Sequence, residues 1–246
     1  MNIKKIIILF LSVFVIFSIS CKKNPIKELF RTTEDTIEII IGTVSKTSIE
    51  MSTGVITSGK DYDRVKSISS KLVKYADRDI SYKFKVLNLP YPNAFAVPGG
   101  FIYITKKLVQ MTNDDELACV IGHEIGHVEA RHSIKAFEKQ LIYSKILDYY
   151  SKKSNTVDKN KDLIMIANTI FNELRFSREN EREADRFGVD FAIAAGYNPY
   201  GMITFFKKLN ELEGGEESGA LKILRTHPLT SERIDYTGLY IKKRLQ

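Results

Sequence analysis

Apolar residues recur at helical spacing along most of the chain and alternate with polar residues in one short region. Residues 61–77 have the clearest helical pattern within a stretch that begins near residue 33. From about 81 to 104, the segments SYKFKVLNL and FIYIT alternate in the manner of short strands. Helical spacing then returns, over 113–133, 134–150, 162–176, 177–195, 200–213 and 230–245. The pattern predicts a mainly helical domain of the α+β class, with a small sheet beside its helices.

The N-terminus differs from the rest of the chain, because two lysines precede a largely apolar run from residue 6 to residue 20. This run is short for a membrane span, which needs about 20 residues, and suits the core of a signal peptide. Cys21 follows at once, which is typical of a lipoprotein signal. We therefore expect a signal peptide over 1–20, a lipidated Cys21 with a tether over 21–32, and one domain over 33–246.

Two residues beside Cys21 bear on this expectation. Ser18 stands where lipoprotein signals usually carry an aliphatic residue, so an uncleaved membrane anchor is the alternative. Lys22 stands where an aspartate would favour retention in the inner membrane, and so it favours the outer membrane. With either kind of anchor, the domain is expected in the cell envelope, attached to a membrane and facing the periplasm or the exterior.

The expected helix over 113–133 carries the sequence HEIGH at 123–127. His123 and His127 are four residues apart, so a helix places them one turn apart on the same face, where two imidazoles can bind one Zn²⁺. Glu124 lies beside them, where it can take a proton from a water on that ion. Three of the four histidines of the chain lie within ten residues, a clustering that favours a metal site.

A second motif, ENEREAD at 179–185, could complete the site. Glu181 could supply a carboxylate as third ligand, which would leave the fourth position open as a catalytic zinc requires. Asp185, one helical turn later, could hold a ligating histidine through its free ring N–H. On spacing alone, Glu179 and Glu183 compete with Glu181 for the ligand role. The alternative is a solvated, charged helix face, because the segment is rich in both signs of charge.

Together with these motifs, the chain resembles a family of zinc peptidases that includes the CAAX prenyl proteases, the HtpX-like heat-shock proteases and the OMA-type mitochondrial protease. The matching stretches are NAFAVPGGFIYITKKL at 93–108, ELACVIGHEIGHVEARHS at 116–133, ENEREADRFGVDFA at 179–192 and THPLTSERI at 226–234. More closely, the chain looks like the periplasmic bacterial lipoprotein members that lack a tetratricopeptide array. The resemblance implies a gluzincin-type domain that binds one Zn²⁺ per chain through His123, His127 and Glu181.

The resemblance also implies an edge strand that binds substrate ahead of the metal helix. Its residues are Asn93, Ala94, Phe95 and Ala96. An edge strand suits a peptidase, because its unpaired N–H and C=O groups can pair with an extended substrate backbone. The alternative is a turn-rich connection, because prolines and glycines surround the segment, and the two interpretations are compatible.

His227, in the sequence THP, is a further candidate for the catalytic site. In periplasmic relatives the corresponding histidine can reach the zinc, where it would close the site at rest or hydrogen-bond the oxyanion during catalysis. The alternative is a loop histidine without a role in the site. His132 is expected to be structural, together with Arg131, and Cys119 to be a buried apolar residue and not a ligand.

These features predict a zinc-dependent endopeptidase that acts on extended or misfolded envelope proteins in protein quality control, with Glu124 as general base. The alternative is a lipid-anchored chaperone or assembly factor with a latent zinc site. The net charge of +7 comes without clusters of basic and aromatic residues, which argues against a nucleic-acid partner. The expected partners are polypeptide substrates and, through the lipid anchor, a membrane.

Overall fold

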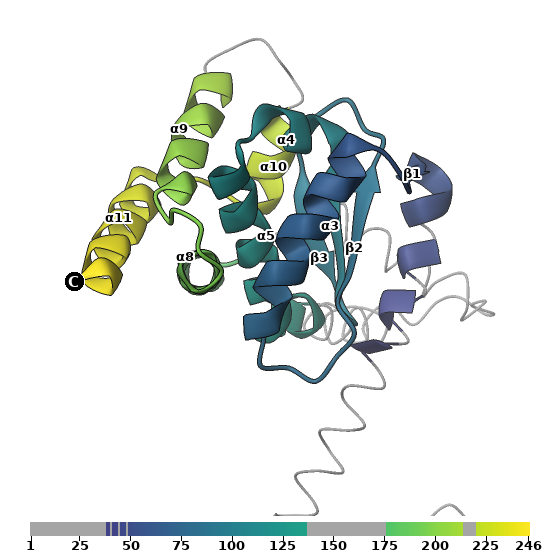
Figure 1. Cartoon of the computed structure of the whole chain (residues 1–246), viewed down its shortest axis with the longest axis horizontal. Helices are drawn as coiled ribbons and strands as arrows, with labels where there is room; N and C mark the ends of the chain where they lie inside the picture. The colour runs from purple at the N-terminus through teal and green to yellow at the C-terminus, as the bar shows by residue number, and fades with distance from the viewer. Residues whose placement is uncertain (1–37, 40, 44, 48, 137–175, 214–219) are drawn as a thin grey trace, which may run out of the picture. The chain divides into compact units, whose positions relative to one another are not determined.

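A computed structural model describes residues 38–39, 41–43, 45–47, 49–136, 176–213 and 220–246 (Figure 1). The expected signal peptide, Cys21 and the tether lie outside the described residues, as do most of the helices expected over 134–150 and 162–176. In the part of the chain that is described, every helix is too short or too polar to cross a membrane. The prediction of a mainly helical α+β domain with a small sheet is confirmed.

A four-stranded mixed sheet forms, and three of its strands lie in the region where the sequence alternates. The fourth, at Val55–Ile56, lies in the stretch from about 33 to 77 that was expected to be helical, so that prediction is wrong there. The strands of the sheet are β1 (Val55–Ile56), β2 (Lys83–Leu87), β3 (Ala94–Val97) and β4 (Phe101–Thr105), in the order β1-β2-β4-β3. β2 and β4 are parallel, whereas β1 pairs with β2 and β3 pairs with β4 in antiparallel fashion. Every residue of β4 is buried, which explains why its sequence is almost wholly apolar.

Two helices cover one face of this sheet (Figure 1). They are α3 (Lys60–Leu72), which ends in a 3₁₀ turn over Val73–Tyr75, and α5 (Asp114–Glu129), which follows the short α4 (Lys106–Met111). Asn113 caps α5 by accepting a hydrogen bond from the Glu116 N–H, and the Glu116 side chain accepts one from the Asn113 N–H. All residues of α5 from Glu116 to Val128 are buried, so this helix is the centre of the fold.

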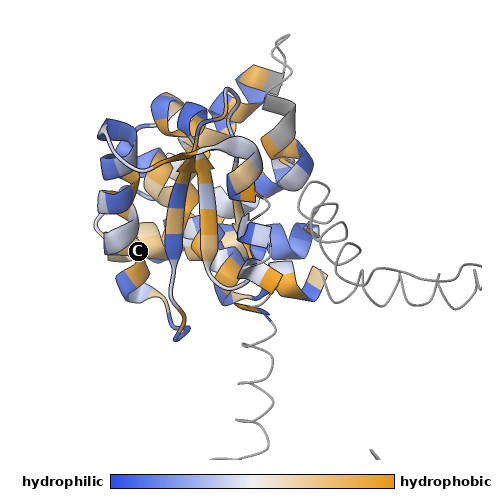
Figure 2. Cartoon of the chain, turned by 90° about the vertical axis from the view of Figure 1, so that its right-hand side faces the viewer, coloured by the Kyte–Doolittle hydropathy of each residue, from blue (hydrophilic) through white to orange (hydrophobic). Residues whose placement is uncertain are grey.

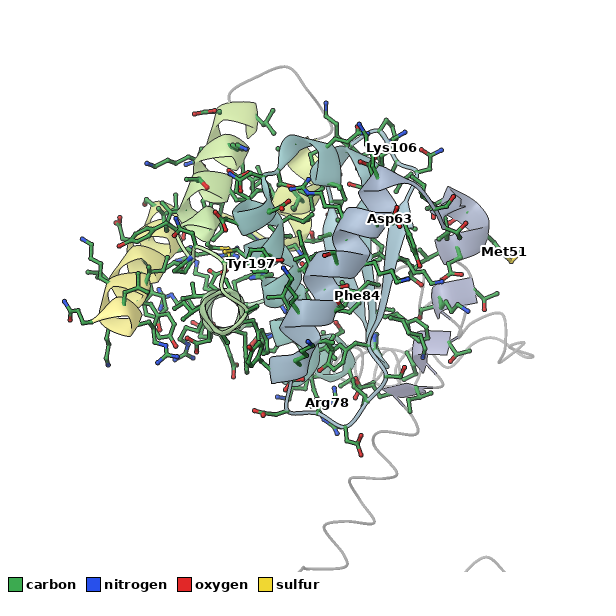
Figure 3. The ribbon with its side chains drawn as sticks, viewed as in Figure 1. Met51, Asp63, Arg78, Phe84, Lys106 and Tyr197 are labelled. Atoms are coloured by element: carbon green, nitrogen blue, oxygen red, sulfur yellow. The ribbon has the colours of Figure 1, made fainter. Side chains whose placement is uncertain are left out.

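The remaining helices pack on the other side of α5. They are α8 (Arg178–Ala194), α9 (Gly201–Glu213), α10 (Ala220–Thr226) and α11 (Ser231–Leu245). In Figure 1, α8 is seen almost along its axis beside α5, with α9 and α11 outside it. In Figure 2 the central strands are largely in the hydrophobic colour, whereas the helices around them carry both colours. Polar side chains such as Asp63 and Lys106 lie at the outside in Figure 3, and Met51 projects from the domain with 84% of its surface exposed.

Glycines allow α5 and α8 to approach closely. A Cβ atom on Gly188 would lie 2.8 Å from the Cys119 carbonyl oxygen, and one on Gly122 would lie 3.1 Å from the Cα atom of Gly188. Real Cβ atoms essentially never come within 3.0 Å of such atoms, so larger residues would push the two helices apart. The contact brings the HEIGH segment of α5 against the ENEREAD segment of α8.

The expected helix over 113–133 is wrong at its C-terminal end. α5 ends at Glu129, and Arg131 adopts the left-handed conformation with a φ of 57°. A new helical segment starts at His132 and is described to residue 136. Helices usually end this way at a glycine, and none stands here, so the local sequence carried no signal for the stop.

β3 lies at an edge of the sheet, and among the described residues β4 alone pairs with it. The Asn93 carbonyl accepts a hydrogen bond from the Thr105 N–H at 2.9 Å, so the backbone of Asn93 faces β4. Because backbone groups alternate along an antiparallel strand, Ala94 and Ala96 direct theirs toward the open edge. The open edge of β3 runs beside α5.

Candidate metal centre

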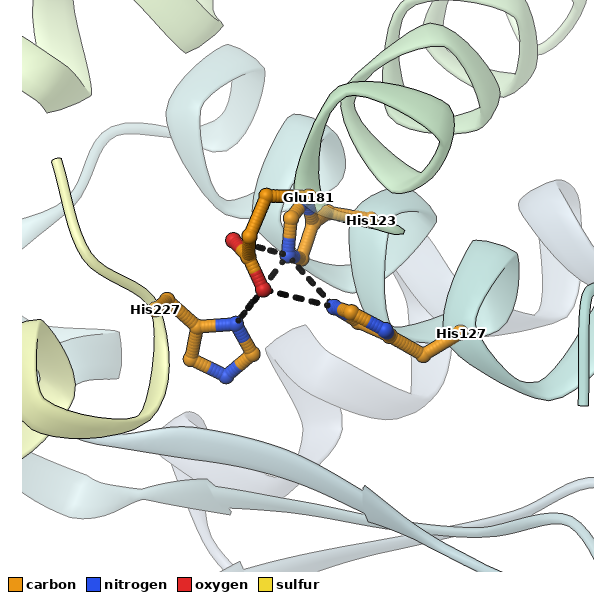
Figure 4. Close-up of side chains that lie close together, drawn as sticks. All are labelled: His123, His127, Glu181 and His227. Carbon is orange, nitrogen blue, oxygen red and sulfur yellow. Dashed lines mark hydrogen bonds and ion pairs between the residues drawn. The ribbon is translucent and has the colours of Figure 1, made fainter. Parts of the chain in front are cut away.

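Four side chains from three parts of the chain converge at the junction of α5 and α8 (Figure 4). They are His123 and His127 from α5, Glu181 from the first turn of α8, and His227 from the segment after α10. One ligand atom of each lies within 4.8 Å of the corresponding atoms of the other three. All four side chains are buried, with 6% or less of their surface exposed. The structure therefore brings together the three zinc ligands that the resemblance implied and the further candidate His227.

The spacing of these atoms fits a tetrahedral ion. The two Nε2 atoms of His123 and His127 are 3.0 Å apart, and oxygens of Glu181 lie 3.6 Å and 3.4 Å from them. Ligands on a tetrahedral Zn²⁺ with bonds of about 2.0–2.1 Å are separated by about 3.3–3.4 Å. Two imidazoles and one carboxylate are also the donor set of many catalytic zinc sites. The residues present therefore fit the group that the sequence implied.

His227 lies on the same cluster. Its Nδ1 atom is 3.3 Å from His123 Nε2 and 3.0 Å from Glu181 Oε1, which are again separations of ligands that share an ion. Its Nε2 atom points elsewhere, is buried, and has no hydrogen-bond partner. This atom lies 3.5 Å from an oxygen of Glu124. His227 can thus contribute a fourth nitrogen to the cluster or turn its ring toward Glu124.

Asp185 and Arg233 hold the cluster from behind. Asp185 Oδ1 accepts a hydrogen bond from His123 Nδ1 at 2.9 Å, so the opposite nitrogen of that ring faces the cluster. Arg233 donates from Nε and Nη2 to the two oxygens of Asp185, at 2.6 Å and 2.7 Å, and its Nη1 lies 2.5 Å from Glu181 Oε2. One buried guanidinium therefore pairs with both acidic side chains and fixes their orientation.

Arg233 received no role from its sequence motif, THPLTSERI. A signal was nevertheless available, because two acidic residues buried one helical turn apart on α8 require a cation. The sequence could not say which of the many basic residues would supply it. Arg233 reaches them because the Thr230 side chain caps α11 at its start and turns the first residues of this helix toward α8.

The charges of the site follow from this network. Although burial disfavours the charged form of Glu181, Arg233 and His227 hold the pKa of its carboxyl well below the ordinary value. Asp185 is likewise buried, and Arg233 keeps its pKa low. Burial lowers the pKa of His127 well below its ordinary value, so this ring is neutral, as a metal ligand must be.

The pKa values of the other two groups shift upward. Burial raises the pKa of Glu124, although the positive charge available on His227 and His123 opposes the rise. Burial disfavours a charged ring on His227 as well, but Glu181 and Glu124 raise its pKa to about 9. Glu124 Oε2 is buried and has no hydrogen-bond partner, so this oxygen is available to a reacting molecule. A carboxyl with a raised pKa is suited to accept a proton and return it.

The other acidic residues of ENEREAD lie elsewhere. Glu179 is exposed on α8, whereas Glu183 lies 3.3 Å from the Nε2 atom of His132. His132, expected to be structural on a more distant part of the helix, is buried, and its Nδ1 atom lies 2.9 Å from Nδ1 of His127. Cys119 is buried as expected, and burial raises the pKa of its thiol to about 12.

The open edge of β3 reaches the site at Ala96. The Ala96 backbone hydrogen-bonds the Glu124 carboxylate, and the Ala96 carbonyl accepts a hydrogen bond from Ser133 Oγ at 2.9 Å. The edge strand and the candidate general base are therefore adjacent. A small apolar cavity of about 20 Å³ adjoins His123, Glu124 and His227. Its apolar lining comes from Val120, Met202, Phe205, Phe206, Leu209, Ile223 and Leu229.

Comparison with known proteins places these residues in a wider group. Residues 60–237 of this chain match Peptidase family M48, and this range contains the whole cluster. The chain is 37% identical over 155 residues to the mitochondrial metalloendopeptidase OMA1 of Arabidopsis thaliana, covering 63% of this chain and 30% of that protein. It is 31% identical over 182 residues to the beta-barrel assembly-enhancing protease of Escherichia coli, covering 69% of this chain and 37% of that protein.

A third relative is nearer to this chain in length. Metalloprotease LoiP of Escherichia coli is 31% identical over 155 residues, which cover 62% of this chain and 60% of that protein. The matched region thus spans between 30% and 60% of the length of these three relatives.

Proposed function

The chain belongs to Peptidase family M48, and this membership supports a metallopeptidase. We propose that it is a zinc-dependent endopeptidase. The observation that carries the proposal is the buried cluster of His123, His127 and Glu181, whose ligand atoms have the separations of a tetrahedral site. Zn²⁺ bound there would supply Lewis acidity, since it lowers the pKa of water to about 7 and polarises a carbonyl oxygen.

Glu124 is the proposed general base. Its free Oε2 atom takes a proton from the attacking water, and the same carboxyl then gives that proton to the leaving amine. Asp185 holds His123 in the tautomer whose Nε2 atom is unprotonated, which is the form that can bind a metal. Arg233 keeps Glu181 and Asp185 charged, so the site retains two anionic groups to balance a divalent cation.

The substrate is proposed to be an extended polypeptide that lies along β3. Ala94 and Ala96 direct their backbone groups toward the open edge. Those of Ala96 bond Glu124 and Ser133, so a substrate would have to displace these hydrogen bonds to pair at Ala96. Of the strand expected from the sequence, Asn93 and Phe95 face β4 and so contribute side chains and not edge hydrogen bonds. A substrate must expose its backbone to pair in this way, which favours unfolded or misassembled proteins.

The place of action is proposed from the N-terminal sequence and from the relatives. Cys21 is the proposed lipidation site, and the cell envelope, with the outer membrane favoured, is the proposed location. One relative is named a beta-barrel assembly-enhancing protease, which supports the proposed role in the quality control of envelope proteins.

A second function, a chaperone or assembly factor with a latent zinc site, is favoured by one observation. His227 Nδ1 lies at ligand distance from the rest of the cluster, so this ring can fill the position that a substrate or water would need. A site closed in this way would bind zinc and hold a client on β3 without cutting it. Displacement of His227 would convert the latent form into the active form.

The two functions are separated by cleavage of casein by zinc-loaded wild type, Glu124→Gln and His227→Ala, with the zinc content of each measured. An endopeptidase is expected to lose all measurable cleavage in Glu124→Gln while it keeps one zinc per chain. Cleavage that appears only in His227→Ala would establish the latent form. Full activity in Glu124→Gln would refute the role of Glu124, and wild type without zinc would refute the metal site.

A further inference from the structure

A chain of hydrogen-bonding groups leads from the metal cluster to the protein surface through His132. His127 Nδ1 lies 2.9 Å from His132 Nδ1, and His132 Nε2 lies 3.3 Å from Glu183 Oε2. The His127 side chain is fully buried and that of His132 is 2% exposed, whereas the Glu183 side chain is 46% exposed. The inference drawn from this chain rests on the proposed function, because it concerns how the metal ligand His127 is held.

If His127 binds a metal, the protons of these hydrogen-bonding groups have a single possible arrangement. Its Nε2 atom faces the cluster and must be unprotonated to bind the ion, so its Nδ1 atom carries the proton. His127 Nδ1 therefore donates to His132 Nδ1, which must be an acceptor. The proton of a neutral His132 is then on Nε2, which donates to the Glu183 carboxylate. In this arrangement each donor faces an acceptor, as the chemistry of these groups requires.

We propose that His132 is a positioning residue for the metal site, which sets the tautomer and ring orientation of His127 and is itself oriented by Glu183. The other ligating histidine, His123, has the equivalent contact directly with a carboxylate, that of Asp185. A ring contact adds to the support of His127, because Phe176 stacks on it with ring centroids 4.0 Å apart and 25° between the planes.

An imidazole is suited to this position because of the charges nearby. Glu124, Glu181 and Asp185 are already buried around the cluster, and Arg233 is the buried cation that pairs with two of them. A fourth buried carboxylate would raise the cost of burying negative charge. His132 makes the contact as a neutral group and leaves the charge of Glu183 partly in water.

The backbone turn after α5 makes the contact geometrically possible. On a continuous helix, a residue five positions after His127 would lie about 140° around the axis and about 7.5 Å along it, out of reach of the ring. α5 instead ends at Glu129, and the left-handed Arg131 returns the chain so that His132 faces His127. An arginine is strained in this conformation, and the contacts of the turn offset the strain.

The test compares His132→Asn with His132→Phe in the full-length chain. Asparagine can place its Oδ1 acceptor near the position of Nδ1, whereas phenylalanine keeps the ring shape and removes the acceptor. Zinc affinity is measured by competition with a chromogenic chelator, and the geometry of the site by the visible absorption spectrum of bound Co²⁺. We expect His132→Phe to bind zinc about 10- to 100-fold more weakly, with an altered Co²⁺ spectrum, and His132→Asn to stay within a few-fold of wild type.

Equal zinc affinity and equal Co²⁺ spectra in His132→Phe and wild type would overturn the proposal. So would an equal loss in both variants, because an acceptor supplied by asparagine would then not restore zinc binding. If His132→Phe does not fold, His132→Ala takes its place in the same comparison. Glu183→Ala is expected to weaken zinc binding, whereas Glu179→Ala, an exposed glutamate on the same helix, is the control that should not.

Failure of the proposed function gives a different result. If wild type binds no zinc, the metal site and the role of His132 both fall. If wild type binds zinc and cleaves casein while all His132 variants bind zinc equally well, the role of His132 falls alone.

Discussion

Replacing Arg233 with methionine should strongly destabilise the metal-free protein. Methionine has a similar length but no charge, so the substitution leaves Asp185 and Glu181 buried without the cation that contacts both. Breaking a buried ion pair on one side costs about 3–5 kcal/mol, and here two carboxylates lose their partner. A domain has a total stability of about 5–15 kcal/mol, so Arg233→Met should remove a large part of it.

Arg244→Met is the matched control. Arg244 lies on the same helix, α11, and pairs with Asp190 on the same partner helix, α8, at 2.6 Å. Its side chain is 48% exposed and that of Asp190 is 36% exposed, so water screens the pair. The expected loss is no more than about 1 kcal/mol. The two variants make the same chemical change and differ in burial.

The assay is thermal and urea unfolding of the full-length chain after removal of metal by a chelator. A loss of about 3–5 kcal/mol corresponds to a fall in Tm of about 6–20 °C for a domain of this size. Adding zinc should recover part of the loss in Arg233→Met, because the ion would balance the charge of Glu181. Equal effects of the two substitutions would refute the conclusion that burial gives the Arg233 contacts their energy.

The effect of Arg233→Met should also depend on pH. The folded-state pKa values of Asp185 and Glu181 are lower than their ordinary values. The stability that comes from this shift is fully present above the unfolded-state pKa values of about 4 and is lost as the pH falls through the folded-state values. The difference in Tm between wild type and Arg233→Met should therefore shrink below about pH 4. A difference that stays constant to pH 3 would contradict the electrostatic explanation.

Two further predictions concern helix packing and capping. Gly188→Ala should destabilise the protein by about 1–3 kcal/mol and weaken zinc binding, because its Cβ would lie 2.8 Å from the Cys119 carbonyl oxygen and separate α8 from α5. Gly238→Ala on α11, where a Cβ would have no neighbour within 4 Å, should instead stabilise by about 0.4–1 kcal/mol, and urea unfolding of both variants checks the opposite signs. Glu116→Gln should lower the free energy of unfolding above about pH 4, the pKa of glutamate in the unfolded chain, and should change it little below that pH. Although burial favours a raised pKa for Glu116, Lys208 and the Asn113 N–H lower it. Unfolding curves at pH 7 and pH 3.5 test this prediction, which fails if the loss is equal at both.

Local sequence was sufficient for much of the fold and of the site. The apolar spacing and the Asn113 cap determine α5, and the four-residue spacing of His123 and His127 then places both rings on one face. The alternation of polar and apolar residues predicts β2 and β4, but the burial of every residue of β4 was not predicted from it. These features depend on interactions within a few residues, which the sequence displays directly.

Other features were decided only when distant segments packed together. The spacing of ENEREAD allowed Glu179, Glu181 or Glu183 as the ligand, and the close approach of α8 to α5 turned Glu181 to the cluster and Glu183 to His132. Arg233 and His227 reach the same point from the C-terminal region, more than 40 residues beyond Glu181 along the chain. The contact of His132 with His127 depends on the left-handed conformation of Arg131, which the sequence did not predict because no glycine stands there. In each case, the orientation of a charged or polar side chain was determined by the free energy of burying it beside a partner from another segment. A linear sequence contains both partners but not the distance between them.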